Sequence, residues 1–228
     1  MTNKIMENGV EIEFLGHSGF LLAKGEHRIA VDPFLSKNPQ AVKTPSDIKV
    51  QDILITHGHS DHIGDAVEIA KLNDVTVVSN FEIAKYFERN GAKAQGIPLG
   101  KTHNFLWGTA QFRFAMHSGL LPDKEPFGMA SSILFDFKDI KIYHLGDTAL
   151  HLDFKLVNEI YKPDIAMVPI GGAANMNIDE AVVACKWLGV KKVIPIHYQI
   201  NALNNVNPLE FKDKVEALGG VECIVMKP

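Results

Sequence analysis

Three imidazoles and one carboxylate lie within six residues, His-Gly-His-Ser-Asp-His, from His57 to His62. The apolar run 52–56 directly before them is typical of a buried strand. Two histidines at i and i+2 in an extended loop can point the same way, whereas Asp61 and His62, at a helix start, face another direction. Imidazole and carboxylate groups bind zinc and similar divalent ions. Four ligands divided in this way favour two adjacent metals, so the segment predicts one half of a two-metal site.

The predicted secondary structure follows the same order in both halves of the chain. Apolar patterns and turn residues predict strands at 11–14, 18–22, 28–31, 52–56, 76–79, 111–116, 131–135, 141–145, 165–169, 192–196 and 221–226. They predict helices at 61–72, 82–90, 153–161, 179–188 and 209–218. Each half thus begins with strands and ends with helices that alternate with strands.

This order favours an α/β (α+β) protein in which two mixed sheets pack face to face, with helices outside, as a four-layer αββα sandwich. No linker rich in Pro, Gly or Ser divides the sequence. We therefore expect residues 1–228 to form a single domain.

Composition excludes several classes of protein. The net charge is −4, and no basic run is longer than the pair Lys191 and Lys192, which makes a nucleic-acid partner unfavourable. No run approaches the roughly 20 apolar residues of a membrane span, and residues 1–9 lack the order of a signal peptide. We expect a cytoplasmic protein with a small-molecule substrate; a homo-oligomer stays open. Cys185 and Cys223 lie in apolar stretches and are interpreted as buried thiols rather than as a disulfide or metal ligands.

Three later residues each follow an apolar strand, where a loop would open over the sheets. They are His117, Asp147 and His197. Each alone could be a structural residue. Their shared position at strand ends, together with the histidine cluster, indicates that they complete one site.

On these residues the sequence resembles the metallo-β-lactamase superfamily, whose signature is His-x-His-x-Asp-His followed by a His, an Asp and a His. Further phrases resemble the small stand-alone metal-dependent hydrolases related to the ascorbate-phosphate lactonases; they lie at 15–20, 31–34, 56–65, 143–148 and 195–198. The resemblance covers about 11–227. It implies the metallo-β-lactamase fold and a ligand set: His57, His59 and His117 for one metal, Asp61, His62 and His197 for the other, and Asp147 as the bridge.

The implied activity is metal-dependent hydrolysis. Two divalent ions, zinc first and manganese second, would generate a metal-bound hydroxide that cleaves an ester, lactone or similar bond of a small molecule. Asp61, Asp147 and His197 would carry the catalytic roles. Two alternatives remain: a phosphodiesterase or nuclease of the same fold, and a non-catalytic metal-bearing sensor or scaffold.

Four residues near the motifs have open roles. His17, after the first strand, either faces the site or belongs to a polar turn. Asp32 either orients a ligand imidazole, as metal-binding histidines usually require, or begins a turn. His144 is expected to be structural, and Tyr198 either donates to a substrate oxygen or packs as an aromatic ring.

Two loops are candidate walls of the substrate pocket. Residues 118–132 and 171–177 are apolar or small, which favours a modest, weakly charged organic substrate. Arg113 or Lys124 could serve a phosphate. The phrase at 171–176 departs from its usual polar and aromatic form in close relatives, which affects substrate contacts rather than metal binding.

Overall fold

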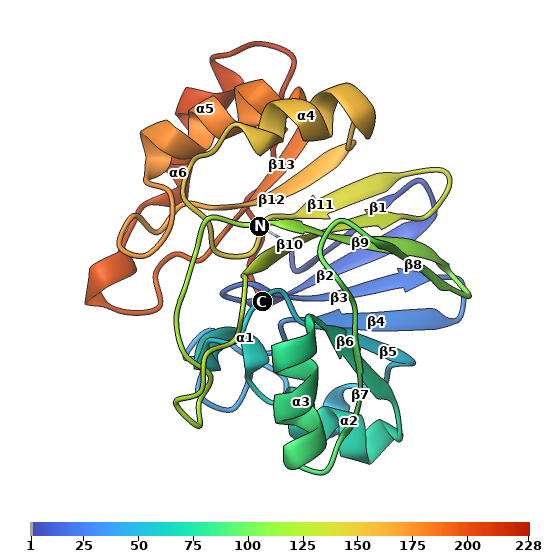
Figure 1. Ribbon diagram of the computed structural model, residues 1–228. Helices are drawn as coiled ribbons and strands as arrows, with labels where there is room; N and C mark the ends of the chain where they lie inside the picture. The colour runs from blue at the N-terminus through green and yellow to red at the C-terminus, as the bar shows by residue number, and fades with distance from the viewer. Residues whose placement is uncertain (1) are drawn as a thin grey trace.

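The first half of the chain forms one seven-stranded sheet. The structure, a computed structural model, describes residues 2–228 (Figure 1). The strands lie side by side in chain order: β1 (Lys4–Glu7), β2 (Val10–Gly16), β3 (Gly19–Lys24), β4 (His27–Val31), β5 (Asp52–Leu54), β6 (Thr76–Ser79) and β7 (Lys93–Gly96). Neighbours from β1 to β4 are antiparallel, and those from β4 to β7 are parallel.

The second half repeats this plan. Its seven strands are β8 (Thr102–Phe105), β9 (Gly108–Phe114), β10 (Ser131–Asp136), β11 (Lys141–His144), β12 (Ile165–Pro169), β13 (Lys192–Ile196) and β14 (Glu222–Cys223). Here β8 to β11 are antiparallel and β11 to β14 parallel. Parallel strands need crossover connections, which in both halves are mostly helices.

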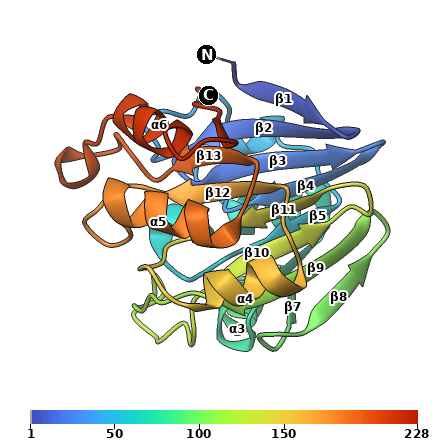
Figure 2. The ribbon, with the colours of Figure 1, turned by 90° about the horizontal axis from the view of Figure 1, so that it is seen from above.

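Helices cover the outer face of each sheet, so the predicted αββα sandwich is confirmed (Figures 1 and 2). The first sheet carries α1 (Ser60–Ile63), α2 (Ala66–Asn73) and α3 (Phe81–Arg89), and the second carries α4 (Asp153–Ile160), α5 (Ile178–Leu188) and α6 (Pro208–Glu216). Side chains alternate between layers. Ile29 and Val31 of β4 lie in the apolar cluster between the sheets, whereas Ala30 faces the helices. Both free cysteines are buried, as expected.

The predicted helix 61–72 is two helices. It breaks at Gly64, whose φ is +47°, and a Cβ there would overlap the backbone of Phe34. The Asp65 carboxylate fixes the break, because its Oδ2 accepts the amides of Leu35 and Ser36 at 2.7 and 3.0 Å. Ser60 is the first helical residue of α1, and His59 is its N-cap. Local periodicity could not reveal a break imposed by a distant loop.

Short polar strands were missed as well. β1, β7 and β8 are edge strands. In each of them, exposed residues alternate with half-buried ones. The last strand is shorter than the predicted 221–226.

Several strands end at one edge of the sandwich, and the residues after them adopt unusual backbone conformations. His17, Asp32 and His197 have φ values of +59°, +43° and +59°. A left-handed conformation costs a residue with a side chain about 1–2 kcal/mol. Such strain concentrates at functional sites, where the surrounding structure holds it.

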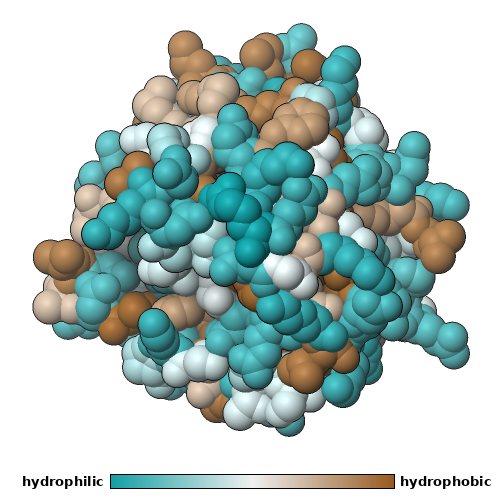
Figure 3. Space-filling view, turned by 60° about the horizontal axis from the view of Figure 1, so that its bottom comes forward, coloured by the Kyte–Doolittle hydropathy of each residue, from teal (hydrophilic) through white to brown (hydrophobic). Residues whose placement is uncertain are grey.

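The surface is mainly hydrophilic on the face shown in Figure 3, where hydrophobic residues form small, separate groups. Among the described residues, none of the helices combines the length and apolar character required to cross a bilayer.

Asn80 is the N-cap of α3, and its side chain also ties the loop after β9 to this helix. Its side chain accepts the Ile83 amide at 2.8 Å and donates to the carbonyls of Phe127 and Met129 at 2.7 and 2.9 Å. Asn80→Ala should therefore lower the free energy of unfolding by about 2–3 kcal/mol, or Tm by about 4–12 °C. Urea and thermal unfolding measure both values. The control Asn90→Ala, at the exposed end of the same helix, should change stability by less than about 0.5 kcal/mol. Equal losses in the two variants would contradict this role.

Candidate metal centre

Three histidines predicted to share a metal converge on one point. His57 Nε2 lies 3.1 Å from His59 Nδ1, and His117 Nε2 lies 3.0 Å from the same atom. These nitrogens form the first donor group. With metal–nitrogen bonds of about 2.0–2.1 Å, neighbouring ligands of a tetrahedral zinc ion are about 3.3 Å apart. The spacing therefore suits one ion held by three imidazoles.

A second donor group consists of Asp61 Oδ2, His62 Nε2 and His197 Nε2. Asp61 Oδ2 lies 3.6 Å from His197 Nε2. His62 Nε2 is buried and lacks a hydrogen-bond partner within the part of the chain that the structure describes. His17 joins this group: its Nε2 lies 2.9 Å from Asp61 Oδ2, and one ligand atom from each of the four residues lies within 4.8 Å of the others. Sequence reasoning had left His17 between a site residue and a turn.

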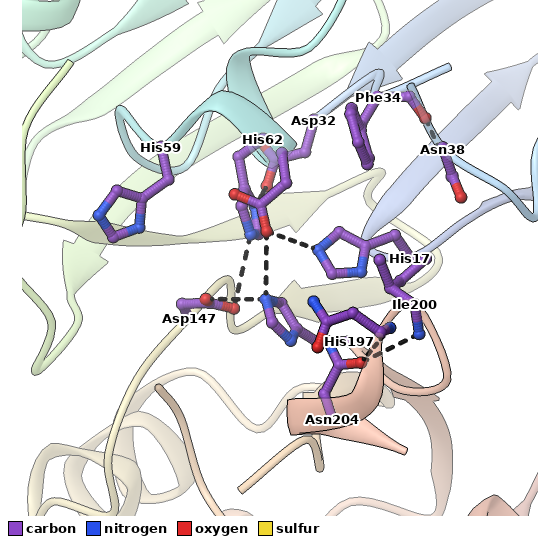
Figure 4. A network of polar contacts seen from close by, with 12 residues as sticks. His17, Asp32, Phe34, Asn38, His59, His62, Asp147, His197, Ile200 and Asn204 are labelled. Carbon is purple, nitrogen blue, oxygen red and sulfur yellow. Dashed lines mark hydrogen bonds and ion pairs between the residues drawn. The ribbon is translucent and has the colours of Figure 1, made fainter. Parts of the chain in front are cut away.

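Asp147 lies between the two groups. Its Oδ2 is 3.0 Å from His197 Nε2 and 3.9 Å from His117 Nε2, and its Oδ1 is 3.5 Å from His62 Nε2. Figure 4 shows Asp147 beside the rings of His62 and His197. The structure thus brings together all seven residues that the sequence predicted as ligands. Asp147, which the sequence analysis expected to bridge two metals, lies near members of both groups.

Asn175 also contacts Asp147, and sequence reasoning missed it. Its Nδ2 donates to Asp147 Oδ1 at 3.3 Å. This residue belongs to the phrase 171–176 that departs from the usual form. The only advance signal was a polar residue in an otherwise small, apolar loop.

Close packing keeps His59 in place. A Cβ on Gly119 would overlap His59 Nε2, so the backbone of this loop rests directly on the ring. The Phe127 ring lies against the rings of His57 and His59, with centroids 5.6 and 5.2 Å apart. The loop 118–132 therefore supports the first donor group.

Asp32 orients one histidine in each group. Its buried carboxylate accepts the Thr56 amide at 2.8 Å, the Thr56 hydroxyl at 2.6 Å and His62 Nδ1–H at 2.7 Å. Because the Thr56 hydroxyl donates to Asp32, it accepts from His57 Nδ1, 3.1 Å away. Both rings then carry a proton on Nδ1, so Nε2 is the nitrogen that each ring can offer to a metal. This is the arrangement that metal-binding histidines usually require.

His144 and Tyr198 are structural. His144 Nε2–H donates to the Ser18 carbonyl at 2.8 Å, and its Nδ1 accepts the Gly146 amide at 3.1 Å. The Tyr198 hydroxyl donates to the Met226 carbonyl at 3.3 Å, and burial raises its pKa to about 12. Neither side chain lines the cavity beside Asp147.

The first donor group is neutral near pH 7. Burial, reinforced by the nearby His62 ring, lowers the pKa of His57 well below its ordinary value. Burial likewise lowers the pKa of His59 and His117. A neutral imidazole is the form that binds a metal. These three nitrogens are therefore ready to donate without losing a proton.

The second donor group lies in a negative field. Burial alone would raise the pKa of Asp147, but His197 and His62 outweigh it and hold that pKa well below its ordinary value. Burial acts to lower the pKa of His62 and His197, but the neighbouring carboxylates outweigh it. The pKa of His62 therefore lies well above its ordinary value, and that of His197 rises to about 9. The group therefore favours positive charge at its centre. Together with the unpartnered His62 Nε2, this fits a divalent cation.

A small cavity opens onto the donors. Its volume is about 180 Å³, and it is lined by His59, Asp61, Asp147, Ala173, Ala174, His197, Asn201, Leu203 and Asn204. The predicted wall 171–177 is present, but 118–132 contributes nothing to this lining. Asn201, Leu203 and Asn204 were not predicted. A larger cleft of about 380 Å³, beside Tyr198 and Met226, contains none of the seven predicted ligands; we assign the chemistry to the smaller one.

Known proteins resemble this chain over most of its length. A family model described as a β-lactamase superfamily domain matches residues 11–197. The chain is 39% identical to a UPF0173 metal-dependent hydrolase of Natranaerobius thermophilus over 96% of this chain and 97% of that protein. It is 37% identical to one from Bacillus cereus, with coverages of 92% and 95%. Igni18, a metallo hydrolase from the archaeon Ignicoccus hospitalis, has a similar structure, with a TM-score of 0.87, 33% identity and coverages of 96% and 95%. The expected fold is confirmed.

His144→Gln should change stability in a pH-dependent way. Near pH 7.5 the variant loses the acceptor of the Gly146 amide, so its free energy of unfolding should fall by about 1–3 kcal/mol. Burial lowers the pKa of His144 below the ordinary 6.5. Below that pH the unfolded chain gains a proton that the folded chain does not, so the stabilisation by His144 is complete above pH 6.5 and is lost as pH falls toward the folded pKa.

The difference between wild type and His144→Gln should therefore shrink from pH 7 to pH 5, by up to about 1.4 kcal/mol per pH unit. Urea unfolding at each pH gives the two free energies. A difference that grew on acidification would show that His144 is charged in the folded protein.

Proposed function

Because the chain belongs to the β-lactamase superfamily and, within it, to the UPF0173 metal-dependent hydrolases, we propose that it hydrolyses a small, uncharged carboxylic ester or lactone at a two-metal site. The observation that carries this proposal is the pair of donor groups on either side of Asp147, open to a small cavity whose lining contains no Arg or Lys side chain. Zinc is the first ion to test, because imidazoles dominate the donor set. Manganese is the second.

The proposed ligands divide as the donor groups do. His57, His59 and His117 would hold one ion, and Asp61, His62 and His197 the other, with Asp147 between them. Two divalent ions held by these residues would activate water near neutral pH and would stabilise negative charge on the attacked group. The remaining steps depend on the protein's own side chains.

Asp61, Asp147 and His197 act where the substrate meets the donors, because all three line the cavity. Asp147 stays ionised at neutral pH, so it accepts hydrogen bonds from water and orients the attacking oxygen. Asn175 Nδ2 donates to Asp147 Oδ1 and so helps to hold this carboxylate in place. No Ser or Cys nucleophile is required for this chemistry.

Cavity chemistry sets the substrate class. Ala173, Ala174 and Leu203 supply apolar surface, while the amides of Asn201 and Asn204 supply polarity without charge. The volume of about 180 Å³ is below the roughly 300–1,000 Å³ of drug-sized ligand pockets. A short acyl group or a small lactone ring suits these dimensions.

A phosphodiester fits less well. Phosphate sites usually contain Arg or Lys, and no such residue lines this cavity. Arg113, one of the two predicted phosphate partners, is paired with the Asp153 carboxylate at 3.0 and 3.1 Å. Lys124 lies outside the cavity lining.

The test compares two bond classes with one leaving group. The full chain, loaded with Zn²⁺ or Mn²⁺, should hydrolyse p-nitrophenyl acetate with a kcat/KM on the order of 10²-fold above that for bis(p-nitrophenyl) phosphate. It should also open the ring of γ-butyrolactone, a reaction that is measured by the acid it releases. Asp147→Asn should reduce kcat for the ester by about 10²–10³-fold. A faster phosphodiester reaction would favour the nuclease alternative. Absence of turnover with two ions bound would favour the sensor or scaffold.

A matched control separates substrate binding from metal chemistry. Leu203 lies on the cavity wall and is 79% exposed. Leu203→Ala should leave metal content unchanged and should alter KM for p-nitrophenyl butyrate more than for the acetate.

A further inference from the structure

We propose that His17 is a positioning residue of the second donor group: its Nε2–H donates to Asp61 Oδ2 and holds that carboxylate toward the cation. This inference rests on the proposed two-metal site and deepens it. His17 does not line the cavity, so it acts through Asp61 rather than on the substrate.

The position of His17 in the hairpin is unusual for a histidine. Residues 17 and 18 join β2 to β3, and His17 has a φ of +59°. Glycine and asparagine are the residues that tolerate this conformation most easily. The imidazole is nevertheless almost completely buried, with 1% exposure. A strained backbone that buries a polar ring beside Asp61 indicates a role for the ring.

The main chain of His17 is held independently of that ring. Its amide donates to Gln40 Oε1 at 3.0 Å. Its carbonyl accepts the His197 amide at 2.9 Å, which ties the hairpin to another member of the second donor group. Substitution of the ring therefore leaves both attachments available.

The ring itself has a fixed orientation. Its Nε2 is 2.9 Å from Asp61 Oδ2, and its centroid is 4.1 Å from that of His197. The Phe34 ring contacts it edge-on, with a centroid distance of 5.8 Å. Figure 4 shows His17 beside His197, on the side of the centre away from His59.

The surroundings of Nδ1 distinguish a donor from a metal ligand. A ligand that binds through Nε2 carries its proton on Nδ1 and usually donates it, as His62 does to Asp32. His17 Nδ1 is buried and has no acceptor among residues 2–228. Placing the proton on Nε2 leaves only a lone pair there and avoids a buried, unmade donor. His197 Nδ1 also lacks a partner, but its Nε2 lies between two carboxylates, where a ligand belongs.

Three variants of the full chain test this role. Gln extends its amide nitrogen to about the place of Nε2 and can donate to Asp61, whereas Asn suits the backbone but is too short. Each protein is loaded with two equivalents of Zn²⁺, and metal retention is followed against a chelator of known affinity. His17→Ala and His17→Asn should weaken retention of one ion by about 10–100-fold and leave the other within about twofold. His17→Gln should restore the affinity to within about threefold of wild type.

Substitution with Co²⁺ gives a second readout. Its visible spectrum reports the ligands themselves, so His17→Gln should keep the wild-type spectrum. Unchanged retention in His17→Ala would overturn the proposal. Loss in His17→Gln equal to that in His17→Ala, with an altered cobalt spectrum, would also overturn it, because His17 would then be a ligand. If wild type retained fewer than two ions, the proposed function itself would fail.

If His17→Ala does not fold, metal retention in His17→Gln and His17→Asn still distinguishes a positioning role from a purely structural one. A purely structural role predicts that Asn, the better residue for this backbone, retains metal at least as well as Gln. A positioning role predicts the reverse. Thermal unfolding of the metal-free variants reports their backbone stability separately.

Discussion

One buried carboxylate, that of Asp32, sets the chemistry of both donor groups. It accepts three hydrogen bonds, two from Thr56 and one from His62, and through the Thr56 hydroxyl it also fixes His57. A carboxylate without exposure to water is costly unless such bonds satisfy it. The same bonds decide which nitrogen of each ring is free. The donor lone pairs are thus directed by a residue that would not itself touch a metal.

The donors come from both sheets, and hydrogen bonds between the sheets fix their separation. The segment His57–His62 follows the first sheet, whereas Asp147 and His197 follow strands of the second. The Ser131 amide and hydroxyl both donate to the Thr56 carbonyl, at 3.1 and 2.6 Å. His144 and Ser18 form a further link. The position of Asp147 between the donor groups is therefore a property of the folded chain, as expected for a preorganised site.

The layers, and the convergence of the seven candidate ligands, could be predicted from the sequence, because periodicity marks strands and because residues at strand ends meet at a sheet edge. Contacts between distant loops could not. The break at Gly64 depends on the backbone of Phe34. The hydrogen bond from Asn175 to Asp147 depends on where the loop after β12 folds back. The role of His17 stayed open between a site residue and a turn residue, since nothing local reveals that the hairpin tip is buried against Asp61. The cavity wall at 201–204 has no motif at all.

Anomalous diffraction from crystals of the full chain, recorded at the absorption edge of the bound metal, tests the two-metal assignment most directly. Seven ligands in two groups predict two peaks about 3.5–4 Å apart. One should lie among the imidazoles of His57, His59 and His117, the other beside Asp61, His62 and His197, with Asp147 in contact with both. A single peak, or peaks away from these side chains, would contradict the assignment.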